Sequence, residues 1–446
     1  MCELAHNVLC SFIIELALLI TSGLWAPSLT HPWKGKSDLR LEVVSPFLDR
    51  QHGTEKCVVE QIERLACQYG WKIHLYAQRV DQVQNVRLST APSENADNSI
   101  VWHKVSDIPG PHLLKYSWWL FANQVRRWRD RQFGKTKTDL TYSPGINCLD
   151  ADVIVVHILF HELFSRLSSE LQLRKVPIRI WHLIIHRILY YKFAMFLESM
   201  VYRDLSVRLV AVSNLVAEHL KIYFGRTDVA VIPNAVDTLR FTPGERLARR
   251  DAARQFFNYS DEDFVLLLIG NDWKNKGLEP LLRAFDLVYN LPLRLLVVGA
   301  DDRSLYQPWV ANLASRDRVR FEAPSPQVIS FYAAADAYVG PSLEDAFGLP
   351  IVEAMACGLP VIASVHAGAS ELICDGETGL LLSDPRDPSE IARLIQILCT
   401  NISLRLKMGL AASRFIQANC GWDQNIAKTQ DFLQATLRDR QKNNLS

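Results

Sequence analysis

The sequence has almost no net charge and no paired cysteine motif. Its 49 lysines and arginines are balanced by 48 acidic residues, which leaves a formal charge of +1. This balance excludes a general attraction to nucleic acids or other polyanions, so any basic function must be local. The nine cysteines are scattered and none forms a CxxC pair, which argues against a structural zinc site and a disulfide framework. We therefore expect reduced, mostly buried thiols.

Low-complexity tracts and internal repeats of a solenoid period are also missing from the sequence. The chain has 446 residues, 49% of them hydrophobic and 22% charged, which is the composition of an ordinary globular protein. This composition excludes disorder, collagen and coiled coil. The length exceeds the roughly 100–200 residues that are typical of one domain, so we expect two domains.

An apolar stretch covers residues 8–26 and contains Glu15 near its centre. It is about as long as the roughly 20 residues that cross a bilayer. No lysine or arginine precedes it, as a signal peptide would require, and a carboxylate inside a membrane costs about 2.5–3.5 kcal/mol or more. For residues 1–36 the sequence leaves three alternatives open: an extension outside the fold, an interfacial helix or a membrane segment.

Strand-like and helix-like segments alternate along the rest of the chain in two series. Apolar runs typical of buried strands lie at residues 39–47, 71–80, 150–160, 207–213, 264–270, 293–300, 337–342 and 359–364. Strands that alternate with helices twice over predict an α/β fold with two Rossmann-like parallel-sheet domains. A polar linker at 231–243 separates the two series. We assign residues 37–232 to a first domain, 233–425 to a second, and 426–446 to a C-terminal helix and tail that cross back to the first.

Residues 115–137 differ in composition from their surroundings. They hold seven lysines and arginines against one acid, Asp130, interleaved with aromatic residues such as Trp128. Basic side chains beside aromatic ones suit an anionic membrane surface. The alternative is a solvated helix whose aromatic side chains pack on the core. We expect no nucleic-acid binding, because the rest of the chain has no basic face.

The most informative stretch is residues 341–364, which read PSLEDAFGLPIVEAMACGLPVIAS. Pro350 stands where a first helical residue is favoured, since a proline has no N–H to lose there. The backbone amides of residues 348–351, Pro350 excepted, should then point out of a helix N-terminus and suit phosphate oxygens. Glu353, on the first turn, can accept hydrogen bonds from two neighbouring hydroxyls such as those of a ribose. This pattern predicts nucleotide-sugar binding.

Asp345 and Glu353 are separated by seven residues within a strand, FGLP, helix, CGLP, strand frame. In this frame the chain resembles the retaining glycosyltransferases of family 4, the group 1 glycosyl transferases, which have the GT-B fold. Their signature is written E-x-F-G-L-P-x-x-E-A-M-A-C-G, and Asp345 stands where the family most often has Glu. The resemblance implies that Gly348, Leu349 and Glu353 bind the sugar donor. It implies a catalytic position near the donor sugar for Asp345.

Four further segments are similar to motifs of this family. They are an interdomain motif at 233–243, a phosphate-contacting loop at 270–277, a G-G-x-x-E-like loop at 366–382 and a glycine-rich loop at 49–57. Lys276 matches the family's lysine, whereas Asn271 replaces its usual arginine. The resemblance implies donor contacts for Lys276, Asn271 and Gly368. It also implies an acceptor and diphosphate loop at Gly53 and His52, where His52 replaces a second glycine.

Polar residues follow a predicted strand in the stretch 148–162, at an end that faces the cleft between domains. Among them His157 is our candidate for a catalytic group, because an imidazole can hydrogen-bond a hydroxyl or stabilise charge near the anomeric carbon. A histidine satisfied within the core is the alternative. The first domain is similar to enzymes that glycosylate lipopolysaccharide core or other lipid-linked saccharides.

The resemblance implies a retaining transfer of a hexose-type sugar from a nucleotide-diphosphate sugar to a saccharide or lipid-linked acceptor. We expect no metal and no cofactor besides this donor, since no DxD pair stands at a strand end and Asp301-Asp302 lie in a predicted loop. A cytoplasmic protein, peripheral at the inner face of the plasma membrane, fits these features. A sugar-nucleotide epimerase of the same fold and a non-catalytic GT-B scaffold subunit remain alternatives.

Overall fold

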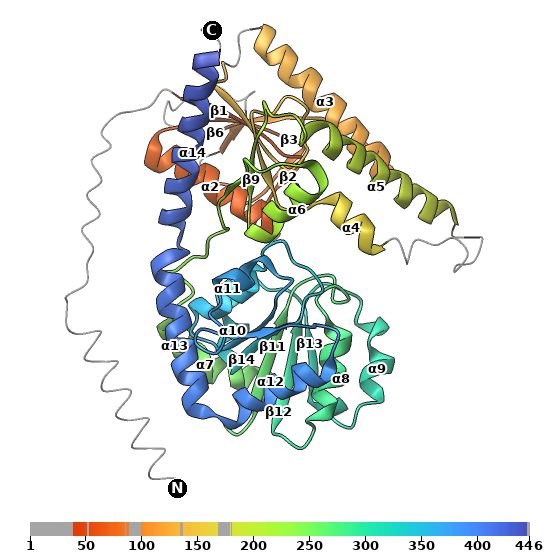
Figure 1. Ribbon diagram of the computed structural model, residues 1–446, viewed down its shortest axis with the longest axis vertical. Coiled ribbons are helices and arrows are strands. Elements are labelled where there is room, and N and C mark those ends of the chain that lie inside the picture. The colour runs from red at the N-terminus through yellow and green to blue at the C-terminus, as the bar shows by residue number, and fades with distance from the viewer. Residues whose placement is uncertain are drawn as a thin grey trace, which may run out of the picture. The chain divides into compact units, whose positions relative to one another are not determined.

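The computed structural model describes residues 39–50, 53–84, 86–88, 100–133, 137–167, 179 and 181–443. Within these residues the chain forms two parallel β-sheets with helices on their faces (Figure 1). A short parallel pair, β2 (Phe47–Leu48) with β4 (Arg79–Val80), adds a minor third sheet. The predicted α/β architecture with two parallel sheets is confirmed.

The first sheet has eight strands in the order β10-β9-β8-β7-β1-β3-β6-β5, and all its pairings are parallel. In that order the strands are Ala230–Val231, Arg208–Ala211, Val153–Val156, Leu140–Pro144, Arg40–Val44, Lys72–Ala77, Ile100–Lys104 and Val86–Leu88. The inner strand β8 is buried over its whole length. Burial on both faces explains why such strands read as continuous apolar runs in the sequence.

Several helices accompany this sheet. They are α2 (Gly53–Tyr69), α3 (His112–Gln132), α4 (Phe160–Leu167), α5 (Trp181–Val201) and α6 (Asn214–Phe224). In α2 the buried side chains include Val58, Ile62 and Leu65, at the three- and four-residue spacing of one helix face. The helix α6 begins after Ser213, whose Oγ accepts the N–H of Val216 at 3.3 Å.

The second sheet has six parallel strands in the order β13-β12-β11-β14-β15-β16. In that order they are Val319–Glu322, Leu293–Val298, Phe264–Ile269, Ala337–Gly340, Val361–Ser364 and Leu380–Leu382. The helices of this half are α7 (Pro243–Phe257), α8 (Leu278–Leu287), α9 (Gln307–Ala311), α10 (Ile329–Ala334), α11 (Leu349–Ala356), α12 (Pro388–Thr400), α13 (Ile402–Asn419) and α14 (Trp422–Asn443). Alternate residues of β11 point to opposite faces: Leu266 packs with α8 and α12, and Leu267 with α10 and α11.

The last helix, α14, leaves the second sheet and runs back along the first (Figure 1). Gln61 on α2 donates to Asn425 at 3.1 Å, and Asn425 donates in turn to the carbonyl of Pro233 at 2.7 Å. Near the other end of the helix, Arg440 donates to Asp152 at 2.6 Å. One helix therefore holds the first domain and the linker between the two sheets.

Three arginines of α3 are bound to internal carboxylates. Arg127 is fully buried and donates to Glu42 on β1 and to both oxygens of Asp150, the latter at 2.6 and 3.0 Å. Arg131 donates to the same two carboxylates at 2.9 and 3.2 Å. Arg126 donates to Asp130, a carboxylate of the same helix, at 3.0 Å. Removing one partner from a buried charge pair typically destabilises a protein by about 3–5 kcal/mol. These arginines therefore stabilise the fold and are not a free basic surface.

A chain of polar side chains is buried between α3 and the first sheet. Asp130 is fully buried and accepts a hydrogen bond from Arg126 at 3.0 Å. His103 Nδ1 lies 3.1 Å from Asp130 Oδ2, and His103 Nε2 lies 3.0 Å from His74 Nδ1. Burial, and then the neighbouring His74, lowers the pKa of His103 to about 4; burial also lowers the pKa of His74. Both imidazoles are therefore neutral at pH 7.

None of the helices in the described ranges has the length and hydrophobicity that a bilayer crossing requires. Residues 1–36, with the apolar stretch 8–26, lie outside the described residues, so their assignment stays a prediction.

The depressed pKa of His103 predicts a loss of stability in mild acid. Below pH 6.5 the unfolded chain binds a proton that native His103 takes up only near pH 4, so the free energy of unfolding falls as the pH falls through this window. Between pH 7 and 5.5 the loss from one such histidine is about 1 kcal/mol. His103→Gln should reduce the wild-type loss by about that amount, as measured by urea unfolding at the two pH values.

The matched control for this experiment is His182→Gln, which changes an exposed histidine of α5. It should leave the difference in the free energy of unfolding between the two pH values unchanged. If His103→Gln loses as much stability on acidification as the wild type, the buried histidine chain does not set the acid sensitivity.

Candidate functional site

The chain turns from the end of β14 into α11 at Gly348. This residue has φ 92° and ψ 57°, a left-handed conformation that glycine adopts without steric penalty. Pro350 follows in the first turn, where it has no N–H to lose. The sequence FGLP therefore determines both the turn and the start of the helix.

The prediction that the amides of residues 348–351 point out of the helix N-terminus does not hold for Ile351. The N–H of Ile351 donates to the carbonyl of Gly348 at 3.0 Å, so it is used within the turn. The amides of Gly348 and Leu349 have no acceptor among the residues that the structure describes. These two N–H groups stand at the positive end of the helix dipole, where anions bind favourably.

Two predicted site residues, Lys276 and Asp345, form an ion pair beside this helix start. The Nζ of Lys276 donates to Oδ2 of Asp345, and the two side chains are only 16% and 18% exposed. The other carboxylate oxygen accepts the N–H of Phe347 at 3.3 Å. A Cβ placed on Gly348 would lie 3.4 Å from Oδ2 of Asp345, so the pair is adjacent to the turn. An ammonium, a carboxylate and the helix amides therefore meet in one place.

Two glycines fix the loop that carries Lys276. A Cβ on Gly270 would lie 2.8 Å from Cε of Lys276, so the lysine side chain packs over bare backbone. Gly277 has φ +74°, and a Cβ there would lie 2.0 Å from the carbonyl oxygen of Pro341. Only glycine allows this loop to approach the end of β14 so closely that Lys276 reaches Asp345.

The side chain of Asn271 braces a neighbouring loop. Its Oδ1 accepts the N–H of Ala300 at 2.9 Å, which joins the loop after β11 to the loop after β12. A neutral amide cannot supply the charge of the arginine that the family usually has at this position. The donor contact expected of Asn271 stays a prediction, and the structure gives the residue a different, structural contact.

Glu353 lies one turn into α11 and is only 6% exposed. The hydroxyl of Tyr332 donates to its Oε2 at 2.8 Å, and the Nζ of Lys56 donates to its Oε1 at 3.1 Å. Burial raises the pKa of Tyr332 well above its usual value, so this hydroxyl keeps its proton. The negative charge of Glu353 raises the pKa of Lys56. Both oxygens of the buried carboxylate therefore have a hydrogen-bond donor.

Gly368 positions the backbone around Asp345. Its N–H donates to the carbonyl of Asp345 at 2.8 Å, and a Cβ on it would lie 2.2 Å from the carbonyl oxygen of Ala346. The same carbonyl accepts the Oγ–H of Ser213, which follows β9 of the first sheet, at 2.6 Å. The structure thus brings Gly368 to the predicted site through its backbone.

The predicted residues of the first domain lie at the same edge of their sheet. Gly53 begins α2, and a Cβ on it would lie 3.5 Å from Cδ1 of Leu349. His52 lies outside the described residues. His157 follows the last residue of β8 and is buried, and this burial lowers its pKa to about 4. Its imidazole is therefore neutral at pH 7 and can serve as a hydrogen-bond donor or acceptor.

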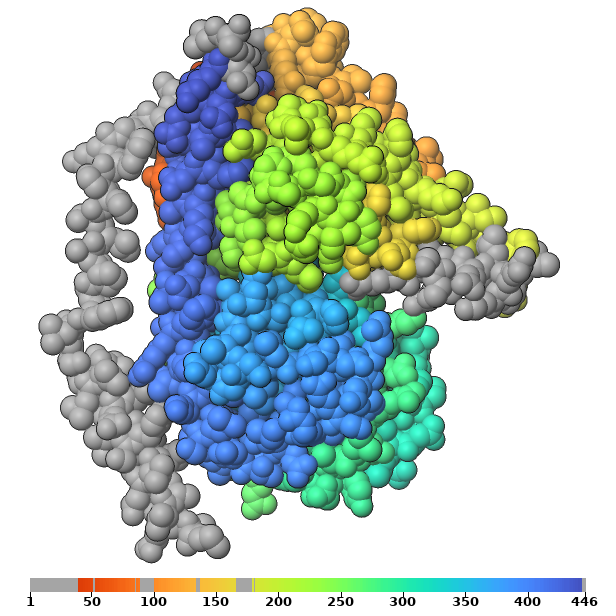
Figure 2. Space-filling model, in the orientation of Figure 1, coloured from red at the N-terminus to blue at the C-terminus, as the bar shows by residue number. Residues whose placement is uncertain are grey.

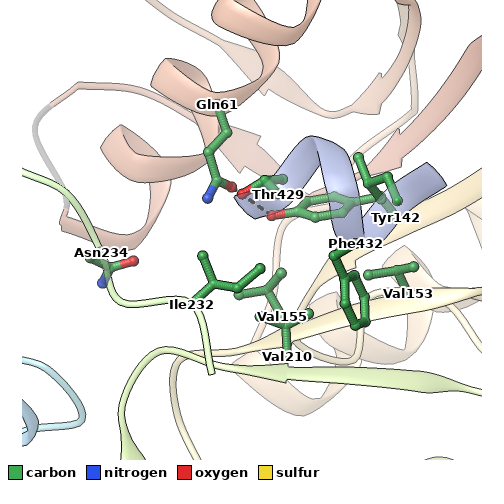
Figure 3. Close-up of a pocket in the computed structure, with 10 residues that line it drawn as sticks. Gln61, Tyr142, Val153, Val155, Val210, Ile232, Asn234, Thr429 and Phe432 are labelled. Atoms are coloured by element: carbon green, nitrogen blue, oxygen red, sulfur yellow. Dashed lines mark hydrogen bonds between the residues drawn. The ribbon is translucent and has the colours of Figure 1, made fainter. Parts of the chain in front are cut away.

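Two cavities in the described part of the chain lie away from these residues. A cavity of about 10 Å³, room for at most one water molecule, lies between β7, β8 and α14 and includes Gln61 and Tyr142, which share a 2.9 Å hydrogen bond (Figure 3). A larger one of about 370 Å³ lies near Arg131 and Arg440, whose guanidinium groups are paired with neighbouring carboxylates. We assign neither to the functional site.

Residues 249–415, which carry Lys276, Asp345 and Glu353, match the family described as "Glycosyl transferases group 1". This match bears out, for this part of the chain, the family resemblance that the motifs indicate. Within the described part of this segment, no cluster of His, Cys, Asp and Glu side chains could hold a metal ion, and the expectation that none is needed stays a prediction.

Curated proteins similar to this chain include two bacterial ones named D-inositol 3-phosphate glycosyltransferase. The protein of Thermobifida fusca (strain YX) is 32% identical over 251 residues, which are 53% of this chain and 56% of the relative. That of Paenarthrobacter aurescens (strain TC1) is 31% identical over 240 residues, which are 51% and 57% of the two chains. The chain thus spans little more than half the length of the curated relatives it matches.

Solved structures extend the likeness to the whole fold. WaaG, a glycosyltransferase involved in lipopolysaccharide biosynthesis, superposes with a TM-score of 0.70 at 16% identity, over 88% of this chain and 99% of WaaG. HepE of Anabaena in complex with UDP-glucose has a TM-score of 0.64 at 17% identity, over 89% and 100% of the two chains. Identities this low show the fold alone, and they confirm the predicted GT-B fold.

The motifs did not single out three side chains that the structure places at the site. Lys56 and Tyr332 hold Glu353, and Ser213 binds the Ala346 carbonyl. Glu371, the Glu of the G-G-x-x-E-like loop, accepts the N–H of Asn214 at 2.9 Å. Lys56 stands inside the motif at 49–57, but nothing in that motif distinguishes it from its neighbours. Tyr332 and Ser213 lie far from Glu353 and Ala346 in the sequence, so only the fold brings them together.

The close approach at Gly277 predicts a large effect of one methyl group. Gly277→Ala places a Cβ against the carbonyl of Pro341 and also strains a left-handed backbone conformation. Gly376→Ala adds only the backbone strain, because Gly376 has φ +77° and its Cβ would have no atom within 4 Å. Gly277→Ala should therefore lower the free energy of unfolding by about 2 kcal/mol more than Gly376→Ala. Urea unfolding of both variants measures this difference.

Equal destabilisation by the two alanines would mean that the loop yields to the added methyl group. The proposed tight junction between the loops at 270–277 and 341–345 would then be wrong.

Proposed function

We propose that the protein is a retaining glycosyltransferase that moves a hexose-type sugar from a nucleotide-diphosphate sugar to a saccharide or lipid-linked acceptor. The observation that carries this proposal is the meeting of Lys276, Asp345 and Glu353 around the start of α11, within the residues that match the group 1 glycosyl transferases. An intact charged cluster of this kind argues against a non-catalytic scaffold.

In the proposed donor complex, the diphosphate lies against the amides of Gly348 and Leu349 and against the ammonium of Lys276. These groups neutralise the charge that develops as the diphosphate leaves. The carboxylate of Glu353 accepts hydrogen bonds from the two ribose hydroxyls, and Asp345 lies near the transferred sugar. The solved complexes of HepE with UDP and with UDP-glucose support a uridine nucleotide as the first donor to test.

In the proposed reaction, the acceptor hydroxyl attacks the anomeric carbon on the face that the diphosphate leaves. A bond from the anomeric carbon to the acceptor oxygen forms as the bond to the phosphate oxygen breaks. The departing phosphate takes the acceptor's proton, so the configuration is retained without a protein nucleophile. The neutral imidazole of His157 hydrogen-bonds a hydroxyl of the reacting sugar, and Gly53 leaves space for the acceptor.

For the acceptor we propose a saccharide or lipid-linked saccharide of the cell envelope, as in the lipopolysaccharide pathway that includes WaaG. The relatives named D-inositol 3-phosphate glycosyltransferase make an inositol phosphate the second acceptor to test. Incubation with UDP-hexoses and each acceptor class distinguishes these two. It also detects a sugar-nucleotide epimerase, which would change the donor without transferring its sugar.

An apolar surface on α3 and α5 supports a membrane-bound acceptor. Phe121 and Trp128 of α3 are 61% and 60% exposed. Tyr116 of α3 packs on Tyr190 and Phe193 of α5, at ring-centroid distances of 5.9 and 6.1 Å, so the two helices are neighbours. Both reach the face shown in Figure 2, as orange and yellow-green segments.

We propose that this surface docks on an anionic membrane. Exposed apolar side chains also lie on the neighbouring helix α5: Leu183, Ile185, Leu189, Phe196 and Met200. Exposed positive charges on the same two helices include Lys115, Arg129 and Lys192. The arginines at 126, 127 and 131 do not take part, because internal carboxylates bind them. The docking surface is therefore more apolar than the sequence of residues 115–137 alone indicates.

Glu353→Gln tests the donor site. The change keeps the shape of the side chain and removes the charge that strengthens its hydrogen bonds, so UDP should bind more weakly by about 1.5–3 kcal/mol, or tenfold or more in Kd. Isothermal titration calorimetry with UDP measures the difference. The control is Glu279→Gln, which removes an exposed carboxylate of α8 and should leave Kd unchanged. If Glu353→Gln leaves the Kd for UDP unchanged, the assignment of Glu353 to the ribose is wrong.

Replacing two aromatic side chains tests membrane docking. The double variant Phe121→Ser, Trp128→Ser should lower the affinity for vesicles of phosphatidylcholine with one-third phosphatidylglycerol by about tenfold or more, since it removes two large apolar groups. Vesicle flotation at fixed salt measures the bound fraction. Phe256→Ser, at an exposed phenylalanine of α7, is the control and should float as the wild type does. Unchanged flotation of the double variant would refute the docking surface.

A further inference from the structure

One ion pair of the site joins residues that no motif connects. Lys56 lies on the first turn of α2, and Glu353 lies on the first turns of α11, 297 residues further along the chain. Their charged atoms, Nζ and Oε1, are 3.1 Å apart. The two helices approach along these turns, because Gly53 faces Leu349 next to the pair. The Lys56–Glu353 pair therefore belongs to a defined junction between the two halves of the molecule.

Glu353 needs a partner at Oε1 when no ligand is bound. Its carboxylate is almost fully buried, and a buried charge without hydrogen bonds is strongly unfavourable. Tyr332 satisfies Oε2 at 2.8 Å and is itself fully buried, so it cannot move away easily. Lys56 satisfies Oε1 from a side chain that is 28% exposed. The exposed and flexible partner is the one that a ligand can replace.

An aromatic ring and a second cation lie close to the ammonium of Lys56. Its ammonium lies 5.8 Å from the ring centroid of Phe241, and the guanidinium carbon of Arg240 lies 5.5 Å from the same ring. Two cations therefore share one aromatic ring, and Arg240 repels the positive charge of Lys56. The attraction to Glu353 holds Lys56 in place against this repulsion.

We propose that Lys56 occupies, in the donor-free protein, the place on Glu353 that a ribose hydroxyl of the donor takes. The inference rests on the proposed function, in which Glu353 binds the ribose. Donor binding replaces the ammonium at Oε1 by a hydroxyl and leaves the bond from Tyr332 intact. Lys56 is thus a stand-in for the ribose that keeps the buried carboxylate paired until the donor arrives.

The stand-in links donor binding to the junction between α2 and α11. When the ribose takes Oε1, the ion pair that ties Lys56 to Glu353 is lost. Displacing Lys56 reduces the net free energy of donor binding. The wild-type protein therefore binds nucleotide more weakly than a variant that lacks the competing ammonium.

Lys56→Met tests the proposal through two measurements with UDP as the probe. At pH 8 the variant should bind UDP about threefold to tenfold more tightly than the wild type, as measured by calorimetry. Without UDP the variant should melt at a lower temperature, because the buried carboxylate has lost a partner. Saturating UDP should then raise its melting temperature by more than it raises that of the wild type.

Lys407→Met, at an exposed lysine of α13, is the matched control and should leave both measurements unchanged. Lys56→Gln, whose neutral amide donates a weaker hydrogen bond, should lie between the wild type and Lys56→Met, and it serves if the methionine variant fails to fold. Weaker UDP binding by these variants would mean that Lys56 contacts the nucleotide directly, and would overturn the proposal. If the wild type itself does not bind UDP, the proposed uridine donor is wrong, whatever Lys56 does.

Discussion

The site depends on one backbone constraint, the left-handed turn at Gly348. Because this residue needs no Cβ, the chain can leave β14 and enter α11 within a few residues. The turn brings the amides of the helix start next to Asp345, and it sets Glu353 one turn further along the same helix. Without it, Lys276 would lack its partner and the buried carboxylate would not face α2. The positions of the charged groups therefore depend on the geometry of the backbone.

A second constraint is that the charges of the site are already paired in the free protein. Lys276 binds Asp345, and Lys56 with Tyr332 binds Glu353, so each buried carboxylate has a hydrogen-bond donor. Burying them unpaired would be strongly unfavourable. A ligand that binds here must therefore replace existing interactions and cannot simply fill a space. This requirement favours a ligand with both an anionic group and hydroxyl groups.

The sequence predicts much of the fold, because buried parallel strands are continuous apolar runs. Each of the eight predicted runs contains a strand of the two main sheets, whereas short or partly exposed strands such as β5 and β10 give no such signal. Within the site, the motifs around Gly348 and Lys276 find residues that the structure brings together. Lys56 and Tyr332 could not be found, because a contact between distant segments leaves no trace in the spacing of either. Arg127 is the converse case: its basic, aromatic surroundings indicated a surface, and the fold buries it against Glu42.

The return of α14 to the first domain has a consequence for how the chain is made. Leu433 on this helix belongs to the core cluster that includes the first sheet, and Arg440 binds Asp152 beside β8. These residues are synthesised long after the strands they cover. Domains generally fold as units during synthesis, N-terminal first. Here the core of the first domain closes only once α14 has been made, so a chain that stops before this helix exposes apolar surface that invites aggregation.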